Sequence, residues 1–173
     1  MELKSNEEKI TRALLVSVDT GEYDAQASLD ELFELVKSAG ADPVLSVTQN
    51  LQKIEKGTFV GTGKLAEIAE ICESQEIDLL VFDSELSPTQ IKNIEAETDV
   101  RVIDRTTLIL DIFAQRARSK EGKLQVELAQ LKYMLPRLTG KGIAMSRLGG
   151  GIGTRAVSYT HLTLPTKLEV QIS

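Results

Sequence analysis

The sequence predicts an α/β fold, namely a small βαβ sandwich on a parallel sheet followed by a long helix. Three observations predict it. Short apolar runs alternate with helical patterns of roughly 10 to 13 residues, as in repeated βαβ units. One run, residues 77–82 (IDLLVF), is apolar except for Asp78, which suits a strand covered on both faces. Beyond Asp104 the strand signals stop, and leucines recur at helical spacing.

The first unit begins with residues 12–18 (RALLVSV), a short branched run that predicts a buried strand. Ser28 is expected to cap the following helix, with Glu31 completing a capping box. Gly40 ends this helix, because glycine readily adopts the conformation that terminates one. A second strand is expected at residues 43–48 (PVLSVT).

The next two units follow the same alternation. A glycine-rich turn, residues 57–63, leads into a helix with Leu65 and Ile68 on its apolar side, and the strand at 77–82 comes next. Pro88, at the first helical position after Ser87, opens another helix to about residue 97. A fourth strand is expected at residues 99–103 (DVRVI), and the α/β domain is taken as residues 1–104.

Residues 105–138 predict one long helix, with an interruption near Gly122. Its leucines, spaced 4, 3, 4 and 3 apart, form a coiled-coil seam, which could instead pack on the domain's own core. These are Leu124, Leu128, Leu131, Leu135 and Leu138. Residues 139–156 follow as a basic loop rich in glycine.

The charge is divided unevenly along the chain. Residues 1–113 hold 10 Lys or Arg against 23 Asp or Glu, a net −13, whereas residues 114–156 hold 9 against 2, a net +7. The overall net charge of −6 therefore conceals a basic arm on an acidic body. Such asymmetry indicates a polyanion partner, because Lys and Arg that neutralise phosphates release counterions. The alternative is a solvated helix face.

One segment resembles a phosphate-binding loop. In residues 57–65 (GTFVGTGKL), Gly61, Gly63 and Lys64 precede a helix whose N-terminus would favour an anion. A P-loop would need glycine in place of Thr58 and Ser or Thr in place of Leu65. A tight turn between strand and helix is the first interpretation. A weak nucleotide or anion site at Gly61, Gly63 and Lys64 is the alternative.

No catalytic constellation or metal site stands out. The single His161 excludes a multi-histidine metal site, and the single Cys72 excludes an internal disulfide and is expected to fill space in the core. Trp is absent and aromatic residues make up 4%, so a base-stacking surface is not expected to dominate. Neither a signal peptide nor a membrane span is predicted. We expect a cytoplasmic monomer.

Four segments together resemble the HflX family of translational GTPases. They are residues 59–68 (FVGTGKLAEI), 81–95 (VFDSELSPTQIKNIE), 100–140 (VRVIDRTTLILDIFAQRARSKEGKLQVELAQLKYMLPRLTG) and 146–155 (SRLGGGIGTR). The resemblance covers roughly residues 10–155. It implies that the α/β part is the family's N-terminal domain and that the long helix belongs to a truncated antiparallel coiled-coil hairpin. The glycine loop would then join the two helices of that hairpin.

The resemblance also implies a function. HflX-like proteins bind the large ribosomal subunit and help to split or rescue stalled ribosomes, notably in stress, so rRNA is the expected partner. The residues expected to touch rRNA lie on the basic arm and its loop: Arg137, Lys141, Arg147, Gly149, Gly150, Gly151, Gly153 and Arg155. GTP and Mg²⁺ are expected in a G domain that this chain lacks. No cofactor and no enzymatic activity are therefore expected here.

Residues 157–173 are predicted not to be native. From Val157 they resemble a translated sequencing adapter of the transposase-tagmentation type, whose codons GTC TCT TAT ACA CAT CTG ACG CTG CCG ACG encode VSYTHLTLPT. The alternative is a genuine divergent tail. Under the adapter hypothesis His161 has no functional meaning, and sequencing an adapter-free amplicon across the Arg155 codon tests it.

Overall fold

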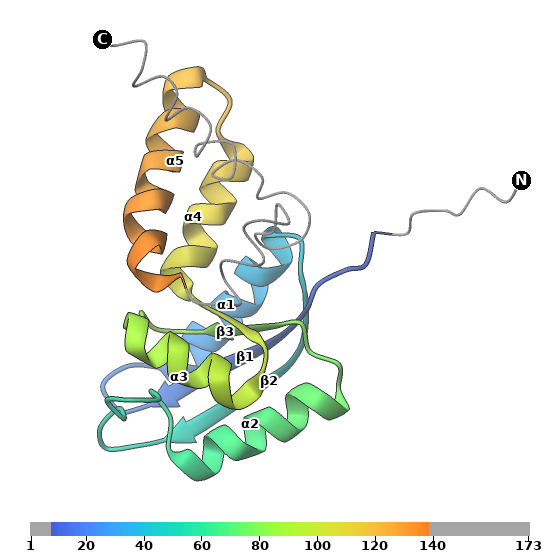
Figure 1. Cartoon of the computed structure of the whole chain (residues 1–173), viewed down its shortest axis with the longest axis vertical. Coiled ribbons are helices and arrows are strands. Elements are labelled where there is room, and N and C mark those ends of the chain that lie inside the picture. The colour runs from blue at the N-terminus through green and yellow to red at the C-terminus, as the bar shows by residue number, and fades with distance from the viewer. Residues whose placement is uncertain (1–7, 139–173) are drawn as a thin grey trace, which may run out of the picture.

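The computed structural model describes residues 8–138, which form a four-stranded parallel sheet with helices on both faces (Figure 1). The strand order is β2-β1-β3-β4, so the chain starts near the middle of the sheet and builds outward in both directions. The predicted parallel α/β fold is confirmed. The strands are β1 (Arg12–Asp19), β2 (Asp42–Asn50), β3 (Leu79–Phe82) and β4 (Arg101–Asp104), and the first three helices are α1 (Ala25–Ser38), α2 (Thr62–Ser74) and α3 (Pro88–Thr98).

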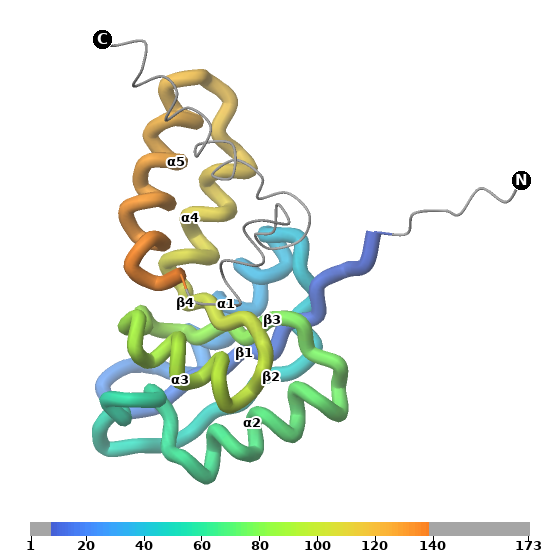
Figure 2. Tube along the Cα trace, in the orientation of Figure 1, coloured from blue at the N-terminus to red at the C-terminus, as the bar shows by residue number. Residues whose placement is uncertain are grey.

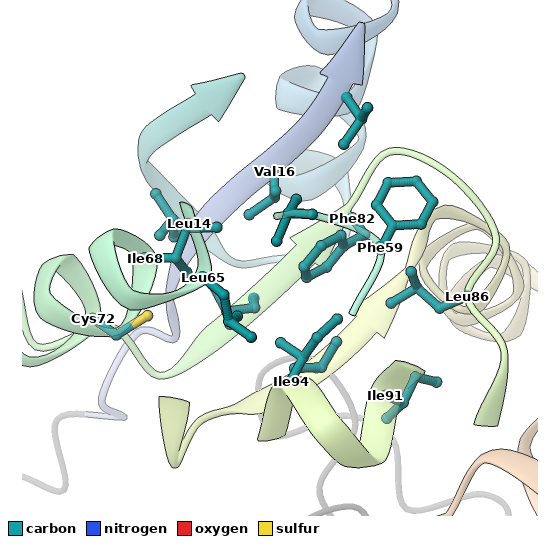
Figure 3. Close-up of a cluster of buried hydrophobic side chains, with 14 of the residues drawn as sticks. Leu14, Val16, Phe59, Leu65, Ile68, Cys72, Phe82, Leu86, Ile91 and Ile94 are labelled. Atoms are coloured by element: carbon teal, nitrogen blue, oxygen red, sulfur yellow. The ribbon is translucent and has the colours of Figure 1, made fainter. Parts of the chain in front are cut away.

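The sheet buries a different set of side chains on each face, as the alternation of side chains along a strand requires. On one face Leu14, Val16 and Phe82 pack against α2 and α3, where the Phe59 ring meets the Phe82 ring edge to face at 5.6 Å (Figure 3). On the other face the strands pack against α1 and α4 (Arg105–Arg116). Cys72 fills space in the first core, as predicted.

The first helix starts earlier than predicted. Asp24, not Ser28, is its N-cap, and its carboxylate accepts a hydrogen bond from the Ala27 N–H at 3.0 Å. Ser28 and Glu31, the expected capping box, lie inside α1 and instead contact the guanidinium of Arg105, at 3.2 Å and 2.7 Å. Two residues four positions apart, Asp24 and Ser28, are of a type that can cap this helix, and the earlier one does. The predicted cap at Ser87 is correct, with Gln90 completing a capping box.

Two strands are shorter or shifted relative to the prediction. β3 starts at Leu79, because the Asp78 carboxylate turns to bind the Arg12 N–H at 3.0 Å and the Lys9 ammonium. β4 starts at Arg101, because Asp99 adopts a left-handed conformation (φ 55°) that ends α3. The apolar pattern in the sequence begins before these polar contacts, so it places the start of each strand two residues too early.

The stretch expected to be one long helix is two helices. α4 ends at Arg116, and α5 (Lys120–Met134) turns back beside it and ends in a short 3-10 helix, η1 (Leu135–Arg137) (Figure 2). The break lies before Gly122, where Ser119 caps α5 by accepting the Gly122 N–H at 2.9 Å. A Cβ on Gly122 would lie 2.9 Å from the Ser119 hydroxyl, so glycine permits this cap rather than interrupting the helix.

Candidate functional site

The basic arm, residues 114–156, begins at the end of α4 and continues through α5, and these two helices form a hairpin. The hairpin stands away from the α2 side of the sheet, and its connecting turn is at the far end (Figure 1). The end of α5 returns to the start of α4, at the edge of the sheet where all four strands end. Most of the expected rRNA contacts, namely Lys141, Arg147, Gly149, Gly150, Gly151, Gly153 and Arg155, lie outside the described residues. Arg137 is described.

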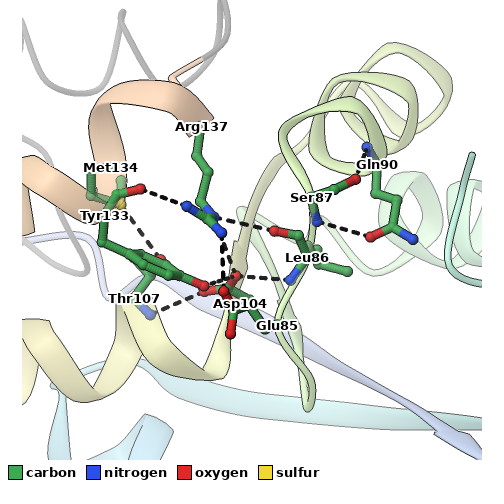
Figure 4. A network of polar contacts seen from close by, with 9 residues as sticks. All are labelled: Glu85, Leu86, Ser87, Gln90, Asp104, Thr107, Tyr133, Met134 and Arg137. Carbon is green, nitrogen blue, oxygen red and sulfur yellow. Dashed lines mark hydrogen bonds and ion pairs between the residues drawn. The ribbon is translucent and has the colours of Figure 1, made fainter. Parts of the chain in front are cut away.

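A buried carboxylate organises the base of the hairpin. Asp104 is the last residue of β4, and its side chain is fully buried. Oδ1 caps α4 by accepting the Thr107 N–H at 3.0 Å and the Thr107 hydroxyl at 2.9 Å. Oδ2 accepts the Leu86 N–H at 3.0 Å and the Tyr133 hydroxyl at 2.6 Å (Figure 4). One side chain therefore joins β4, α4, the β3–α3 loop and α5.

The last turn of α5 completes this network. Burial, and then the hydrogen bond to Asp104, raises the pKa of Tyr133 above its usual range, so the hydroxyl stays protonated and donates. The Arg137 guanidinium lies 3.7 Å from the centre of the Tyr133 ring, which is close enough for a cation–π contact. The sulfur of Met134, one of the buried residues of α5, lies 3.4 Å from the Thr107 hydroxyl.

Arg137 uses its donors inside the protein. Its Nε donates to the Leu86 carbonyl at 3.2 Å, one terminal nitrogen donates to the Tyr133 carbonyl at 2.9 Å, and the other reaches Glu85 Oε1 at 3.1 Å. The side chain is 14% exposed. Its role in the described structure is to hold the end of α5 on the β3–α3 loop. Three of its five N–H donors are engaged by these partners.

The leucine seam faces outward. Leu124, Leu128 and Leu135 are 60%, 52% and 62% exposed, whereas the buried residues of α5 are Gln130 and Met134. The seam is therefore not what attaches α5 to α4, and the alternative that it packs on the domain's own core is wrong for these three residues. Within residues 8–138 no helix covers these three side chains, so they present apolar surface to solvent.

The Gly61–Lys64 turn is engaged with its neighbours. The Gly61 N–H donates to Gln49 Oε1 at 2.9 Å, and the Lys64 ammonium lies 3.2 Å from Glu67 Oε2. Gly63 lies in the first turn of α2, whose N-cap, Gly61, offers no side-chain hydrogen bond. Both groups expected to face an anion therefore have partners within the protein. With Thr58 and Leu65 in place of the P-loop residues, these positions do not fit a nucleotide phosphate with Mg²⁺.

We also searched residues 8–138 for metal ligands, a reactive thiol and membrane-spanning helices. Residues 8–138 contain no group of three or more His, Cys, Asp or Glu side chains that could hold a metal ion. Burial raises the pKa of the Cys72 thiol to about 11, which leaves little of the reactive thiolate near neutral pH. In the same residues, no helix has both the length and the apolar composition needed to cross a membrane.

The sequence analysis did not select Asp104, Thr107 or Tyr133. A signal for part of this network exists, because Asp is one of the preferred N-cap residues of a helix. The contact between Tyr133 and Asp104 spans 29 positions, and no local pattern indicates it. Arg137 lies four residues after Tyr133, a spacing that places two side chains on the same face of a helix. This spacing is the second indication of the network in the sequence.

Two family models match the chain. Residues 26–114 match the model described as "GTP-binding GTPase N-terminal", and residues 116–168 match "GTP-binding GTPase Middle Region". The boundary between the two matches falls at the end of α4. The second match enters residues 157–173, whose origin as a translated adapter stays a prediction.

Curated relatives and solved structures agree with these matches. The chain is 50% identical over 155 residues to "GTPase HflX" of Alkalihalophilus pseudofirmus, and 53% identical over 151 residues to that of Caldanaerobacter subterraneus subsp. tengcongensis. These alignments cover 88% and 87% of this chain but 37% and 35% of the relatives. A GTP-binding protein from Sulfolobus solfataricus, solved in complex with GDP, superposes with a TM-score of 0.57 at 26% identity, over 92% of this chain and 46% of that one.

Proposed function

Because this chain belongs to the HflX family of GTPases, we propose that its basic arm binds the large ribosomal subunit and contributes to splitting or rescuing stalled ribosomes. The charge division carries the proposal: residues 1–113 sum to −13 and residues 114–156 to +7. Phosphate contacts by such an arm supply affinity that does not depend on base sequence. We propose that the α/β domain serves as the support from which the arm projects.

The proposed rRNA contacts are Lys141, Arg147 and Arg155, with the glycines at 149, 150, 151 and 153 allowing close backbone approach. Arg137 has a different part, because its guanidinium is held by Glu85, Leu86 and Tyr133. It fixes the residue from which the loop continues. Lys141, Arg147 and Arg155 are thus proposed to bind RNA, whereas Arg137 is proposed to attach the end of α5 to the β3–α3 loop.

The test is equilibrium binding of the full chain to salt-washed large ribosomal subunits over a range of salt concentrations. Replacing Lys141, Arg147 and Arg155 with Gln removes three phosphate contacts, which lowers the slope of log affinity against log salt by about 2. The matched control replaces three exposed cations of the α/β domain, Lys53, Lys56 and Lys92, with Gln. Equal slopes for the two variants, or no binding by the unaltered chain, contradict the proposal.

The activity named in the relatives, GTP hydrolysis, is proposed to reside outside residues 8–138. The chain spans about a third to two fifths of the relatives' length, and in the Gly61–Lys64 turn the Gly61 N–H and the Lys64 ammonium have partners within the protein. Equilibrium dialysis with ATP and GTP tests the alternative nucleotide site. We expect no saturable binding, and binding that is lost in Lys64→Ala would establish that alternative instead.

A further inference from the structure

Four cations gather at the turn between α4 and α5, where the proposed function assigns no contact. Arg116 ends α4, Arg118 lies in the turn, Lys120 starts α5, and Lys123 follows within the first turn of that helix. All four are exposed. Residues 116–123 contain four basic residues and one acidic residue, Glu121, which gives a net charge of +3.

None of these four cations has a carboxylate partner among residues 8–138. Arg116 donates to the Ser38 hydroxyl at 3.3 Å, whereas the other three side chains form no hydrogen bond or ion pair within residues 8–138. Cations of the α/β domain behave differently, because several of them lie within salt-bridge distance of an acid. These pairs are Lys9–Asp78, Lys37–Glu34, Lys64–Glu67 and Arg105 with Asp83 and Glu31.

The turn lies at the end of the hairpin farthest from α2 and α3 (Figures 1 and 2). It is beside the end of α1, where the Arg116 guanidinium meets the Ser38 hydroxyl. A cation at the start of a helix also opposes the helix dipole, so Lys120 does not serve the stability of α5. These cations are therefore available to a partner of opposite charge.

An exposed aromatic ring lies next to these cations. Phe113 is 56% exposed and precedes Arg116 by three positions, so the two share one face of α4. An apolar ring on the surface costs solvation unless a partner covers it. RNA supplies both complements, because its backbone pairs with Lys and Arg while an unpaired base can stack on Phe.

We infer that the α4–α5 turn is a second RNA-binding surface, in which Arg118, Lys120 and Lys123 meet backbone phosphates and Phe113 stacks on an unpaired base. Arg116, which also contacts Ser38, borders this surface. The inference rests on the proposed function and extends it. The arm then has two contacts with RNA, one at the turn and one in the loop that follows residue 138.

The experiment uses the full chain and two probes, salt-washed large subunits and a short RNA stem–loop with unpaired loop bases. Replacing Arg118, Lys120 and Lys123 with Gln should lower the salt slope by about 2, and the affinity on the order of 100-fold at ~0.1 M salt. The control is again the triple Gln variant at Lys53, Lys56 and Lys92. Phe113→Ala should weaken both complexes several-fold and leave the salt slope unchanged.

The outcomes separate this inference from the proposed function. If large subunits bind the unaltered chain and the turn variant equally well, with the same slope, the inference is overturned and the proposed function stands. If the unaltered chain binds the stem–loop but not large subunits, and the turn variant loses that binding, the turn is an RNA surface and the proposed partner is wrong. Binding to neither probe overturns both.

Discussion

The α/β domain and helix α5 are held in place by different forces. In the domain, leucines such as Leu14 and Leu80 are fully buried between the sheet and its helices. In α5, Leu124 and Leu128 are exposed, and the helix is attached at its end by the polar network around Asp104. The same residue type stabilises one region and is presented to solvent by the other. Buried apolar side chains thus stabilise the α/β domain, and hydrogen bonds fix the orientation of α5.

The largest expected effect tests this difference with one chemical change at two sites. Leu80→Ala should lower the free energy of unfolding by about 2–5 kcal/mol, because it opens a cavity in a fully buried site. Leu128→Ala should change it by about 0.5 kcal/mol or less, since its side chain is 52% exposed. Urea unfolding followed by circular dichroism gives both values. Similar losses at the two sites would mean that the seam is buried in solution.

The polar attachment is tested at Tyr133. Tyr133→Phe removes the 2.6 Å hydrogen bond to the buried Asp104 and should cost about 1.5–3 kcal/mol, the range for bonds to charged groups. The control is Tyr23→Phe, which removes a 2.9 Å bond from a more exposed hydroxyl to the Val18 carbonyl. The control should lose about 1 kcal/mol or less. A larger loss at Tyr23 than at Tyr133 would refute the central role of Asp104.

Arg137 distinguishes attachment from RNA contact. Arg137→Gln should cost about 1–2 kcal/mol of unfolding free energy, since it loses the contacts with Glu85, Leu86 and the Tyr133 ring. Its salt slope for large-subunit binding should stay as in the unaltered chain, because no phosphate contact is removed. Arg118→Gln should show the opposite result: an unchanged free energy of unfolding and a lower salt slope for large-subunit binding. A slope that falls by about 1 in Arg137→Gln would restore this residue to the rRNA contacts.

The sequence predicts the α/β domain well because its stabilising pattern is local. Residues 77–82 are apolar except for Asp78, and the strand that they contain, β3, is buried at all four positions. Ser87 and Pro88 mark the start of α3 by residue type alone. Burial of short apolar runs and the capping of helix ends are each encoded within a few neighbouring positions, so they can be identified without a structure.

The hairpin is harder to predict because its determinants are polar or distant. Residues 117–119 contain neither Gly nor Pro, so nothing but Ser119 signals the turn, and Gly122 draws attention to the wrong place. The regular leucine spacing in α5 indicates a seam but does not say which side meets α4. Arg137 shows the same limit at the site: its charge predicts an RNA contact, whereas its partners lie 51 and 52 positions away.

The smallest expected effect concerns a carboxylate on the face of α4 that packs on the domain. Burial raises the pKa of Asp111 to about 6, although the hydrogen bond from Gln115 and the charge of Arg101 favour the ionised form. Folding therefore favours the protonated side chain. The resulting stability is fully present below about pH 4 and is lost as the pH rises to about 6. A shift of this size corresponds to at most about 3 kcal/mol.

Replacing this carboxylate with a neutral amide should remove the pH dependence while keeping the partner. Asp111→Asn can still accept from Gln115, so at pH 7 it should be more stable than the unaltered chain by about 1 kcal/mol, because burying the polar amide itself costs part of the difference. The control is Asp30→Asn on α1, an exposed carboxylate that also bonds a glutamine four positions away. Urea unfolding between pH 4 and pH 8 measures each variant against the unaltered chain. A parallel pH profile for Asp111→Asn would show that α4 meets the domain through an ionised carboxylate, which would make polar attachment a property of the whole hairpin and not of α5 alone.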